Sequence, residues 1–288
     1  MILRDALKWG EQQLLSSNNS NASMETFWIL SSIYGWTEQS NLWVHLTEPM
    51  NESHQQEFEK YIQNRLDGMP LAYILKLQDF MNFTFEVNEH VLIPRSETEV
   101  LAQHAIVFLS QLKRSCFLDV GTGSGNIAIS IAKNCLNSKG IALDISGLAL
   151  DLAQKNARRY GVLNQIEFIQ SDLFSNIQKS SVQLFDLIVS NPPYIKSVDI
   201  PFLQKEVQLE PLLALDGGES GLEKIISIIQ QSKVFLKPGA RLMLEVGYNQ
   251  SETVQNLCED EHYSDIQIFA DQWGINRVVC ATWRGSNG

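Results

Sequence analysis

The chain has 288 residues, of which 44% are hydrophobic and 19% charged, a composition typical of a globular protein longer than one ordinary domain. Lys and Arg total 22 against 33 Asp and Glu, so the net charge is −11, and no long basic run is present. This balance disfavours DNA or RNA as a partner, because such proteins usually present a basic face to phosphates. It favours a protein partner, particularly one with a basic face.

Membrane, secretory and metal-binding classes are also disfavoured. No apolar run approaches the ~20 residues that span a bilayer, and Arg4, Asp5 and Lys8 near the start do not resemble a secretory signal. The four cysteines have no C-x-x-C spacing and the five histidines are scattered. We therefore expect a cytoplasmic protein with buried free thiols and no metal site.

A small helical domain is predicted over residues 1–74. Apolar residues recur there at helical spacing in three segments, and the third begins at Asn51 and ends at Gly68, before Pro70. Gln and Asn crowd the intervening loops. From its acidic, Gln-rich surface we expect this domain to hold a protein substrate.

Residues 75–94 are predicted to form a β-hairpin linker. Apolar residues alternate from Phe80 to Val87, and a turn at residues 88–90 leads into the apolar residues 91–93. Ser96 and Glu99 then fit a capping box at the start of a helix. The remaining residues, 95–288, are expected to form an α/β domain.

A glycine-rich loop follows the strand-like residues 116–118 and precedes the helix-like residues 126–132; its sequence is Asp119-Val120-Gly121-Thr122-Gly123-Ser124-Gly125. Alternate glycines let the backbone turn tightly and approach a ligand without a Cβ in the way. The dinucleotide pattern G-x-G-x-x-G would need glycine at position 126, where Asn126 stands. The observed spacing suits a nucleoside without phosphates, and Asp119 could orient a cationic ligand. A plain tight turn is the alternative.

Two more carboxylates follow the next predicted strands. Asp144 ends the strand at residues 140–144 and could accept hydrogen bonds from both hydroxyls of a ribose. Asp172 follows the strand at residues 165–170 and could accept from an adenine amine, with Leu173 packing on the ring. Each acid alone is more commonly a solvated loop residue or a helix cap. Three acids in register after three strands favour a nucleoside site.

The tetrapeptide Asn191-Pro192-Pro193-Tyr194 follows a predicted buried strand at residues 184–190. The prolines end the strand and stiffen the loop at the carboxyl edge of the sheet, where open α/β sheets bind ligands. The Asn191 amide then offers one acceptor and one donor in fixed positions, with a ring three residues on. This suits a planar group with an NH2, either an amide or an exocyclic base amine; a merely capping asparagine is the alternative.

The last elements complete the sheet. A helix is predicted at residues 221–236 and a strand at 241–246. The final strands, residues 266–269 and 277–282, are joined by so short a turn that they must pair antiparallel.

Together these motifs resemble the class I S-adenosylmethionine-dependent methyltransferases, and most closely the glutamine methyltransferases that modify peptide-chain release factors. The most specific matches are Gly68–Leu75 and Leu92–Arg95, followed by Glu97, Thr98 and Glu99, and the resemblance covers roughly residues 65–284. It implies a Rossmann-like, mostly parallel sheet with an antiparallel terminal hairpin. It also implies S-adenosylmethionine as cofactor, bound by Asp119, Gly121, Thr122, Gly123, Ser124, Gly125, Asp144, Asp172, Leu173 and Asn191.

The resemblance assigns substrate binding to Asn191, Pro192, Pro193 and Tyr194, with release factors as the protein substrate and the glutamine of their Gly-Gly-Gln motif as the target. An amide nitrogen is a poor nucleophile, so the site must hold it in line with the methyl and favour its pyramidalisation. The Asn191 side-chain carbonyl and the Pro192 backbone carbonyl could accept both amide hydrogens, while Tyr194 packs on the amide plane. No dedicated base is then required.

Three alternatives remain. A nucleic-acid amino-methyltransferase would use the same loop on an exocyclic amine, but would need base extrusion and usually a basic module. A nicotinamide oxidoreductase is disfavoured by Asn126 and by the lack of an evident hydride-transfer acid/base pair. A methyltransferase-shaped binding module without activity is disfavoured because the motif residues are intact.

Overall fold

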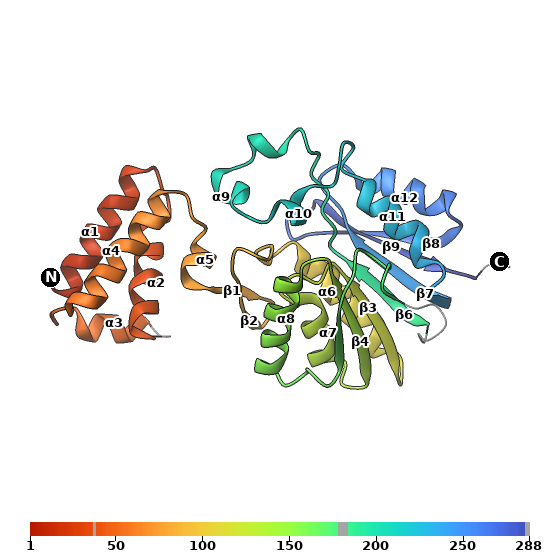
Figure 1. Cartoon of the computed structure of the whole chain (residues 1–288), viewed down its shortest axis with the longest axis horizontal. Helices are drawn as coiled ribbons and strands as arrows, with labels where there is room; N and C mark the ends of the chain where they lie inside the picture. The colour runs from red at the N-terminus through yellow and green to blue at the C-terminus, as the bar shows by residue number, and fades with distance from the viewer. Residues whose placement is uncertain (37–38, 178–183, 286–288) are drawn as a thin grey trace. The chain divides into compact units, whose positions relative to one another are not determined.

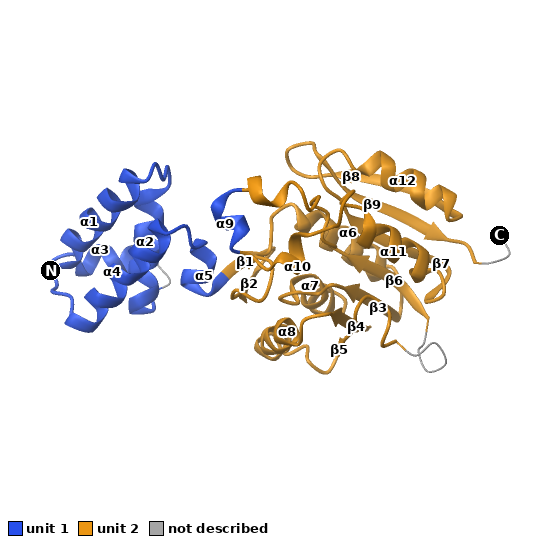
Figure 2. Cartoon of the chain, turned by 45° about the horizontal axis from the view of Figure 1, so that its top comes forward, with its two compact units in different colours: residues 1–77, 204–209 blue, residues 78–203, 210–288 orange. Residues whose placement is uncertain are grey.

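A computed structural model describes residues 1–36, 39–177 and 184–285 (Figure 1). The chain divides into two compact units (Figure 2). The first comprises residues 1–77 and 204–209, and the second comprises residues 78–203 and 210–288. The chain therefore leaves the second unit after residue 203 and returns to it at residue 210. Among the described residues, no helix combines the length and the apolar character needed to cross a membrane.

The first unit is helical. Its helices are α1 (Leu3–Ser16), α2 (Ala22–Tyr34), α3 (Gln39–His45), α4 (Glu52–Leu66), α5 (Leu71–Leu75) and α9 (Lys205–Gln208). The predicted helix start at Asn51 is confirmed, because its side chain accepts a hydrogen bond from the His54 backbone N–H at 2.7 Å. A core that includes Leu14, Phe58 and Ile62 holds these helices together.

Arg65 joins three helices of this unit. Its Nε lies 2.6 Å from Glu25 Oε2, and its Nη2 lies 2.7 Å from Glu206 Oε1. The Arg65 and Glu25 side chains are 11% and 8% exposed, whereas that of Glu206 is 43% exposed. Asn19 also donates to Glu25. Arg65 thus forms two ion pairs: a buried one with Glu25 of α2, and a more exposed one with Glu206, which connects the short α9 to α4.

Strand β1 (Leu77–Phe80) starts at the boundary between the two units and forms a two-stranded sheet with β2 (Phe83–Glu86). The turn of this hairpin lies at Met81-Asn82. The turn predicted at residues 88–90 is also present, because the Val91 N–H donates to the Asn88 carbonyl at 3.2 Å, but it does not join the two strands of the hairpin as predicted. Residues 91–93 form no strand, because the Ile93 N–H is bonded to the Glu210 side chain at 2.9 Å rather than to a neighbouring strand.

The main sheet has seven strands in the order β5-β4-β3-β6-β7-β9-β8. Their bounds are β3 (Ser115–Val120), β4 (Ser138–Asp144), β5 (Ile166–Gln170), β6 (Phe185–Ser190), β7 (Leu236–Glu245), β8 (Tyr263–Ala270) and β9 (Asn276–Trp283). The five neighbouring strands β5, β4, β3, β6 and β7 are all parallel to one another. Strand β9 is antiparallel to both β7 and β8, which confirms the predicted terminal hairpin.

Helices cover both faces of the sheet (Figure 1). Phe117 and Leu187 pack on one face with α6 (Thr98–Ser110), α7 (Asn126–Asn134) and α8 (Gly147–Arg159). The alternate residues Leu118 and Ile188 pack on the other with α11 (Glu223–Ser232) and α12 (Ser251–Asp260). The remaining short elements are the 3-10 turn η1 (Ile200–Phe202) and α10 (Leu212–Leu215). Strand order reverses between β3 and β6, the place where open α/β sheets bind ligands.

The capping box predicted at the start of α6 is wrong. Glu97 is the N-cap residue, has helical backbone angles and makes no capping hydrogen bond. Ser96 donates to the Glu97 carboxylate at 3.1 Å instead. The Glu99 side chain accepts from the Met81 N–H at 2.6 Å. The tertiary contact with the hairpin has therefore replaced the local cap.

Candidate active site

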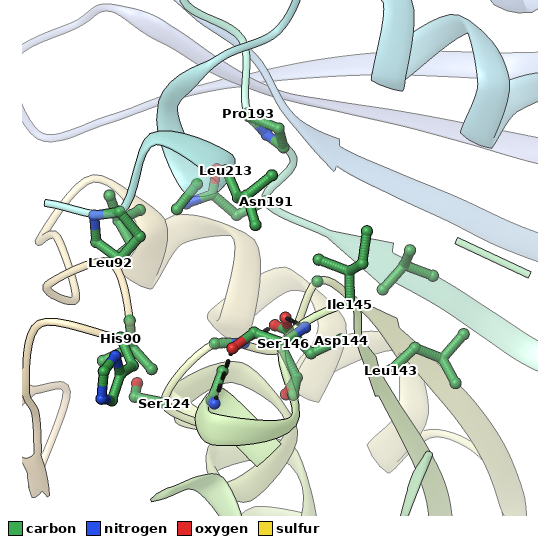
Figure 3. A pocket seen from close by; sticks show the side chains of 18 of the residues that line it. His90, Leu92, Ser124, Leu143, Asp144, Ile145, Ser146, Asn191, Pro193 and Leu213 are labelled. Carbon is green, nitrogen blue, oxygen red and sulfur yellow. Dashed lines mark hydrogen bonds between the residues drawn. The ribbon is translucent and has the colours of Figure 1, made fainter. Parts of the chain in front are cut away.

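A cavity of about 320 Å³ lies at the carboxyl ends of the parallel strands in the second unit (Figure 3). Loops after β3, β4, β5 and β6 form part of its wall, and the rest comes from the segments around residues 89–98 and 211–214. In Figure 3, Asp144 and Ser146 lie on one side of the cavity, and Asn191 and Leu213 lie on the opposite side. This volume lies in the range of pockets that bind small molecules.

The glycine-rich loop presents its backbone to the cavity. Gly121 and Gly123 have φ angles of 75° and 55° and line the cavity, together with Thr122 and Ser124. A Cβ added at either glycine would meet no other atom within 4 Å, so the backbone there faces open space. Gly125 differs: an added Cβ would lie 2.9 Å from Ile129 Cδ1, and the residue does not line the cavity.

Asp119 supports this loop from inside. It is fully buried and its Oδ2 accepts from the Thr122 hydroxyl at 2.7 Å. Burial raises the pKa of Asp119 to about 7, although the hydrogen bond from Thr122 opposes the rise. Asp119 is not among the residues that line the cavity, so its predicted contact with a cofactor stays a prediction.

Asp144 lines the cavity and is held in place by two backbone groups. Its Oδ2 accepts from the Gly123 N–H at 2.8 Å, and its Oδ1 accepts from the Ser146 N–H at 2.9 Å. Burial raises the pKa of this carboxyl despite those hydrogen bonds. Each carboxylate oxygen keeps a second lone pair, so Asp144 can still accept from hydroxyls of a ligand.

Asp172 and Leu173 complete this part of the wall. The exposed Asp172 carboxylate lies 3.7 Å from Lys224 Nζ, and both of these side chains line the cavity. Leu173 also lines it and has a φ angle of 49°, an unusual conformation for a non-glycine residue. The structure thus brings these two predicted residues to the same cavity as Asp144.

The Asn191 loop is attached firmly to the sheet. The Ser190 hydroxyl donates to the Val120 carbonyl at 2.6 Å, and Asn191 Nδ2 donates to Thr98 Oγ1 at 3.1 Å. Asn191 and Pro193 line the cavity, whereas the buried Pro192 does not, so the predicted contact of the Pro192 carbonyl with the substrate stays a prediction. The glycine-rich loop and the Asn191 loop, about 70 residues apart in the sequence, therefore lie side by side at one edge of the sheet.

Tyr194 points toward the protein interior. Its hydroxyl lies 3.4 Å from Glu245 Oε1, and its ring packs against the core that includes Ile188 and Leu244. Burial raises the pKa of its hydroxyl. Tyr194 does not line the cavity, so its predicted packing on a substrate amide stays a prediction.

Glu210, for which no sequence pattern indicated a site role, connects two segments of the cavity wall. Its buried carboxylate accepts from the Ile93 N–H and pairs with Arg95. Arg95, Pro211 and Leu213 line the cavity. Both segments lay within the family resemblance, but the sequence alone contained no signal that they meet.

The fold and the cavity together define the class of this protein: it is a class I S-adenosylmethionine-dependent methyltransferase. Residues 5–75 match the model of the PrmC N-terminal domain, and residues 97–205 match that of the methyltransferase small domain. The chain is 36% identical to the release factor glutamine methyltransferase of Geobacter sulfurreducens, over 96% of this chain and 95% of that protein. The chain belongs to the release factor glutamine methyltransferase family.

Other relatives agree with this assignment. A release factor glutamine methyltransferase of Moorella thermoacetica is 33% identical over 98% of both chains. The bifunctional methyltransferase of Rickettsia felis is 36% identical over 83% of this chain, which matches half of that longer protein. Among solved structures, the ribosomal protein L11 methylase of Lactobacillus delbrueckii subsp. bulgaricus aligns with a TM-score of 0.50 at 20% identity, over 69% of this chain and 84% of that one. The last likeness concerns the fold alone.

Proposed function

We propose that this enzyme transfers a methyl group from S-adenosylmethionine to the side-chain amide nitrogen of the glutamine in the Gly-Gly-Gln motif of peptide-chain release factors. The observation that carries the proposal is the Asn191 amide, held by Thr98 at the edge of the cavity that Asp144 lines. The family assignment points to glutamine as the side chain that enters this site.

The residues present fit the cofactor. The uncovered backbone at Gly121 and Gly123 leaves space for a ligand, and the remaining lone pairs of Asp144 match ribose hydroxyls. Leu173 and Asp172 suit the face and the amine of an adenine. When bound, S-adenosylmethionine supplies an electrophilic methyl group on a sulfonium centre.

The substrate amide must be held and polarised by the chain itself. Asn191 Oδ1 and the Pro192 carbonyl accept the two amide hydrogens, and these hydrogen bonds strengthen as the nitrogen becomes positive. They therefore stabilise the transition state more than the ground state. Positioning of this kind lowers barriers by ~7–11 kcal/mol in well-aligned reactions, so no catalytic base is needed. Solvent accepts the proton that the product cation releases.

The charge of the chain and the chemistry of the motif support a protein substrate. A net charge of −11 suits a partner with a basic face and disfavours a phosphate backbone. Two glycines beside the target leave the glutamine unobstructed, because they carry no side chains at the mouth of the cavity.

Cofactor binding is expected to depend on Asp144. We expect Asp144→Ala to weaken S-adenosylmethionine binding by about 1.5–3 kcal/mol, as for the loss of hydrogen bonds to a charged group. Isothermal titration calorimetry measures this directly. Asp151→Ala is the matched control, since Asp151 is an exposed aspartate on α8 that does not line the cavity. Unchanged affinity in the Asp144 variant would contradict its placement against the ribose.

The substrate assignment is tested by mass spectrometry of a release factor incubated with enzyme and S-adenosylmethionine. We expect one added methyl group on the glutamine of the Gly-Gly-Gln motif, and no addition when that glutamine is replaced by alanine. Parallel reactions with tRNA, ribosomes and DNA should remain unmethylated. Methylation of nucleic acid alone would refute the proposal and favour a base-methylating enzyme.

A further inference from the structure

A chain of four polar side chains lies behind the Asn191 loop. Asn191 Nδ2 lies 3.1 Å from Thr98 Oγ1. The Thr98 hydroxyl lies beside the Glu245 carboxylate, and the Tyr194 hydroxyl lies 3.4 Å from Glu245 Oε1. Thr98 is the first residue of α6 and Glu245 is the last of β7, so the chain connects elements that are distant in the sequence.

Glu245 is the innermost member of this chain. The residue is 1% exposed and Thr98 is 2% exposed, and Glu245 Oε2 has no hydrogen-bond partner within the described ranges. Arg277 is the cation that faces Glu245, and it is itself paired with Asp271 at 3.1 Å. A buried carboxylate costs free energy unless it is well paired, so packing alone does not explain a glutamate here.

The direction of these hydrogen bonds follows from the chemistry of the groups. An ionised carboxylate only accepts, and a threonine hydroxyl has a single hydrogen. When Thr98 donates that hydrogen to Glu245, only lone pairs remain for Asn191. Asn191 must then turn its NH2 toward Thr98, which leaves Oδ1 free for the cavity that Asn191 lines.

We propose that Glu245 is a positioning residue which, through the Thr98 hydroxyl, orients the Asn191 amide so that Oδ1 rather than Nδ2 faces the substrate. This inference rests on the proposed function, in which Asn191 Oδ1 accepts an amide hydrogen of the glutamine. An inverted Asn191 amide would present NH2 to the NH2 of the substrate. The acceptor that strengthens in the transition state would then be lost.

Protonation of Glu245 should allow the Asn191 amide to adopt the inverted orientation. Burial raises the pKa of Glu245 to about 7. The Thr98 and Tyr194 hydroxyls and the charge of Arg277 oppose the rise, while the charge of Glu97 adds to it. Below that pKa the carboxyl can donate to Thr98, which frees the Thr98 hydrogen for Asn191 Oδ1. We therefore expect kcat to fall as the pH is lowered through about 7.

The test compares three variants at saturating substrate and cofactor. Glu245→Gln keeps the size of the side chain but offers donor or acceptor at every pH. We expect its kcat to fall by about 10- to 100-fold, with little change in cofactor affinity and without the low-pH limb. Thr98→Val, which lacks the hydroxyl, should lose as much, whereas Thr98→Ser should recover most of the turnover.

The outcomes separate positioning from packing. A kcat for Glu245→Gln within about twofold of wild type, or a low-pH limb that persists in this variant, would overturn the inference. Equal losses in Thr98→Val and Thr98→Ser would overturn it too, and this pair decides the matter if Glu245→Gln fails to fold. Activity retained in Asn191→Ala would instead overturn the proposed function. If Asn191→Ala lost turnover while the Glu245 and Thr98 variants kept it, the role of Glu245 would be refuted and the proposed function would stand.

Discussion

Asn191→Ala is expected to lower kcat for release-factor methylation by about 10²–10³-fold, the usual effect of removing one preorganised hydrogen-bonding group that acts in the transition state. The loss should appear mainly in kcat, because the Asn191 acceptor strengthens as charge develops on the amide nitrogen. Asn191 also lines the cofactor cavity, so a modest loss of cofactor affinity is compatible with this role. Steady-state kinetics and calorimetry on the same preparation separate the two effects.

A suitable control is Asn164→Ala, since Asn164 is an exposed asparagine that does not line the cavity. Its kcat should match that of the wild-type enzyme. If Asn191→Ala kept wild-type turnover on a release factor, the amide-accepting role of this loop would be refuted, and acceptors elsewhere in the cavity would have to hold the glutamine.

Arg65→Met is expected to lower the free energy of unfolding by about 3–5 kcal/mol, because it leaves the buried Glu25 carboxylate without its cation. Asn19 remains as a hydrogen-bond donor to Glu25 but supplies no charge. Urea unfolding followed by circular dichroism measures the change. The same substitution removes the ion pair between α4 and Glu206 of α9 as well.

Glu206→Gln is the matched control for that prediction. The Glu206 side chain is 43% exposed, and ion pairs of exposed groups contribute only about 0–1 kcal/mol. A similar small loss in both variants would contradict the prediction for Arg65 and would show that Glu25 tolerates burial without a cation.

The sequence pattern of short segments was sufficient to predict those features of the fold that depend on neighbouring residues. The seven strands of the main sheet, the antiparallel pairing of β8 and β9, and the start of α4 at Asn51 were predicted. These features depend on alternation, turn length and capping residues, which act over a few neighbouring residues. Motifs that follow strands were also informative: parallel strands bring their carboxyl ends to one edge, so Asp144, Asp172 and Asn191 reach the same cavity.

Local pattern failed where a distant group competed for the same atoms. The capping box at Ser96 gave way to the hydrogen bond between Glu99 and the Met81 N–H. The strand expected at residues 91–93 gave way to the hydrogen bond from Ile93 to Glu210, which is 117 residues away in the sequence. In both cases one long-range acceptor outweighed a weak local preference.

The sequence by itself therefore determined the class of fold, the cavity edge and the residues that follow each strand, because these depend on periodicity and chain order. Only the tertiary structure decided that Asp119 is buried below its loop, that residues 204–209 belong to the first unit, and that Glu245 lies against Thr98 and Tyr194. The burial of a side chain and the direction of its hydrogen bonds depend on which residues come into contact in the folded protein. Residue spacing in the sequence does not indicate these long-range contacts.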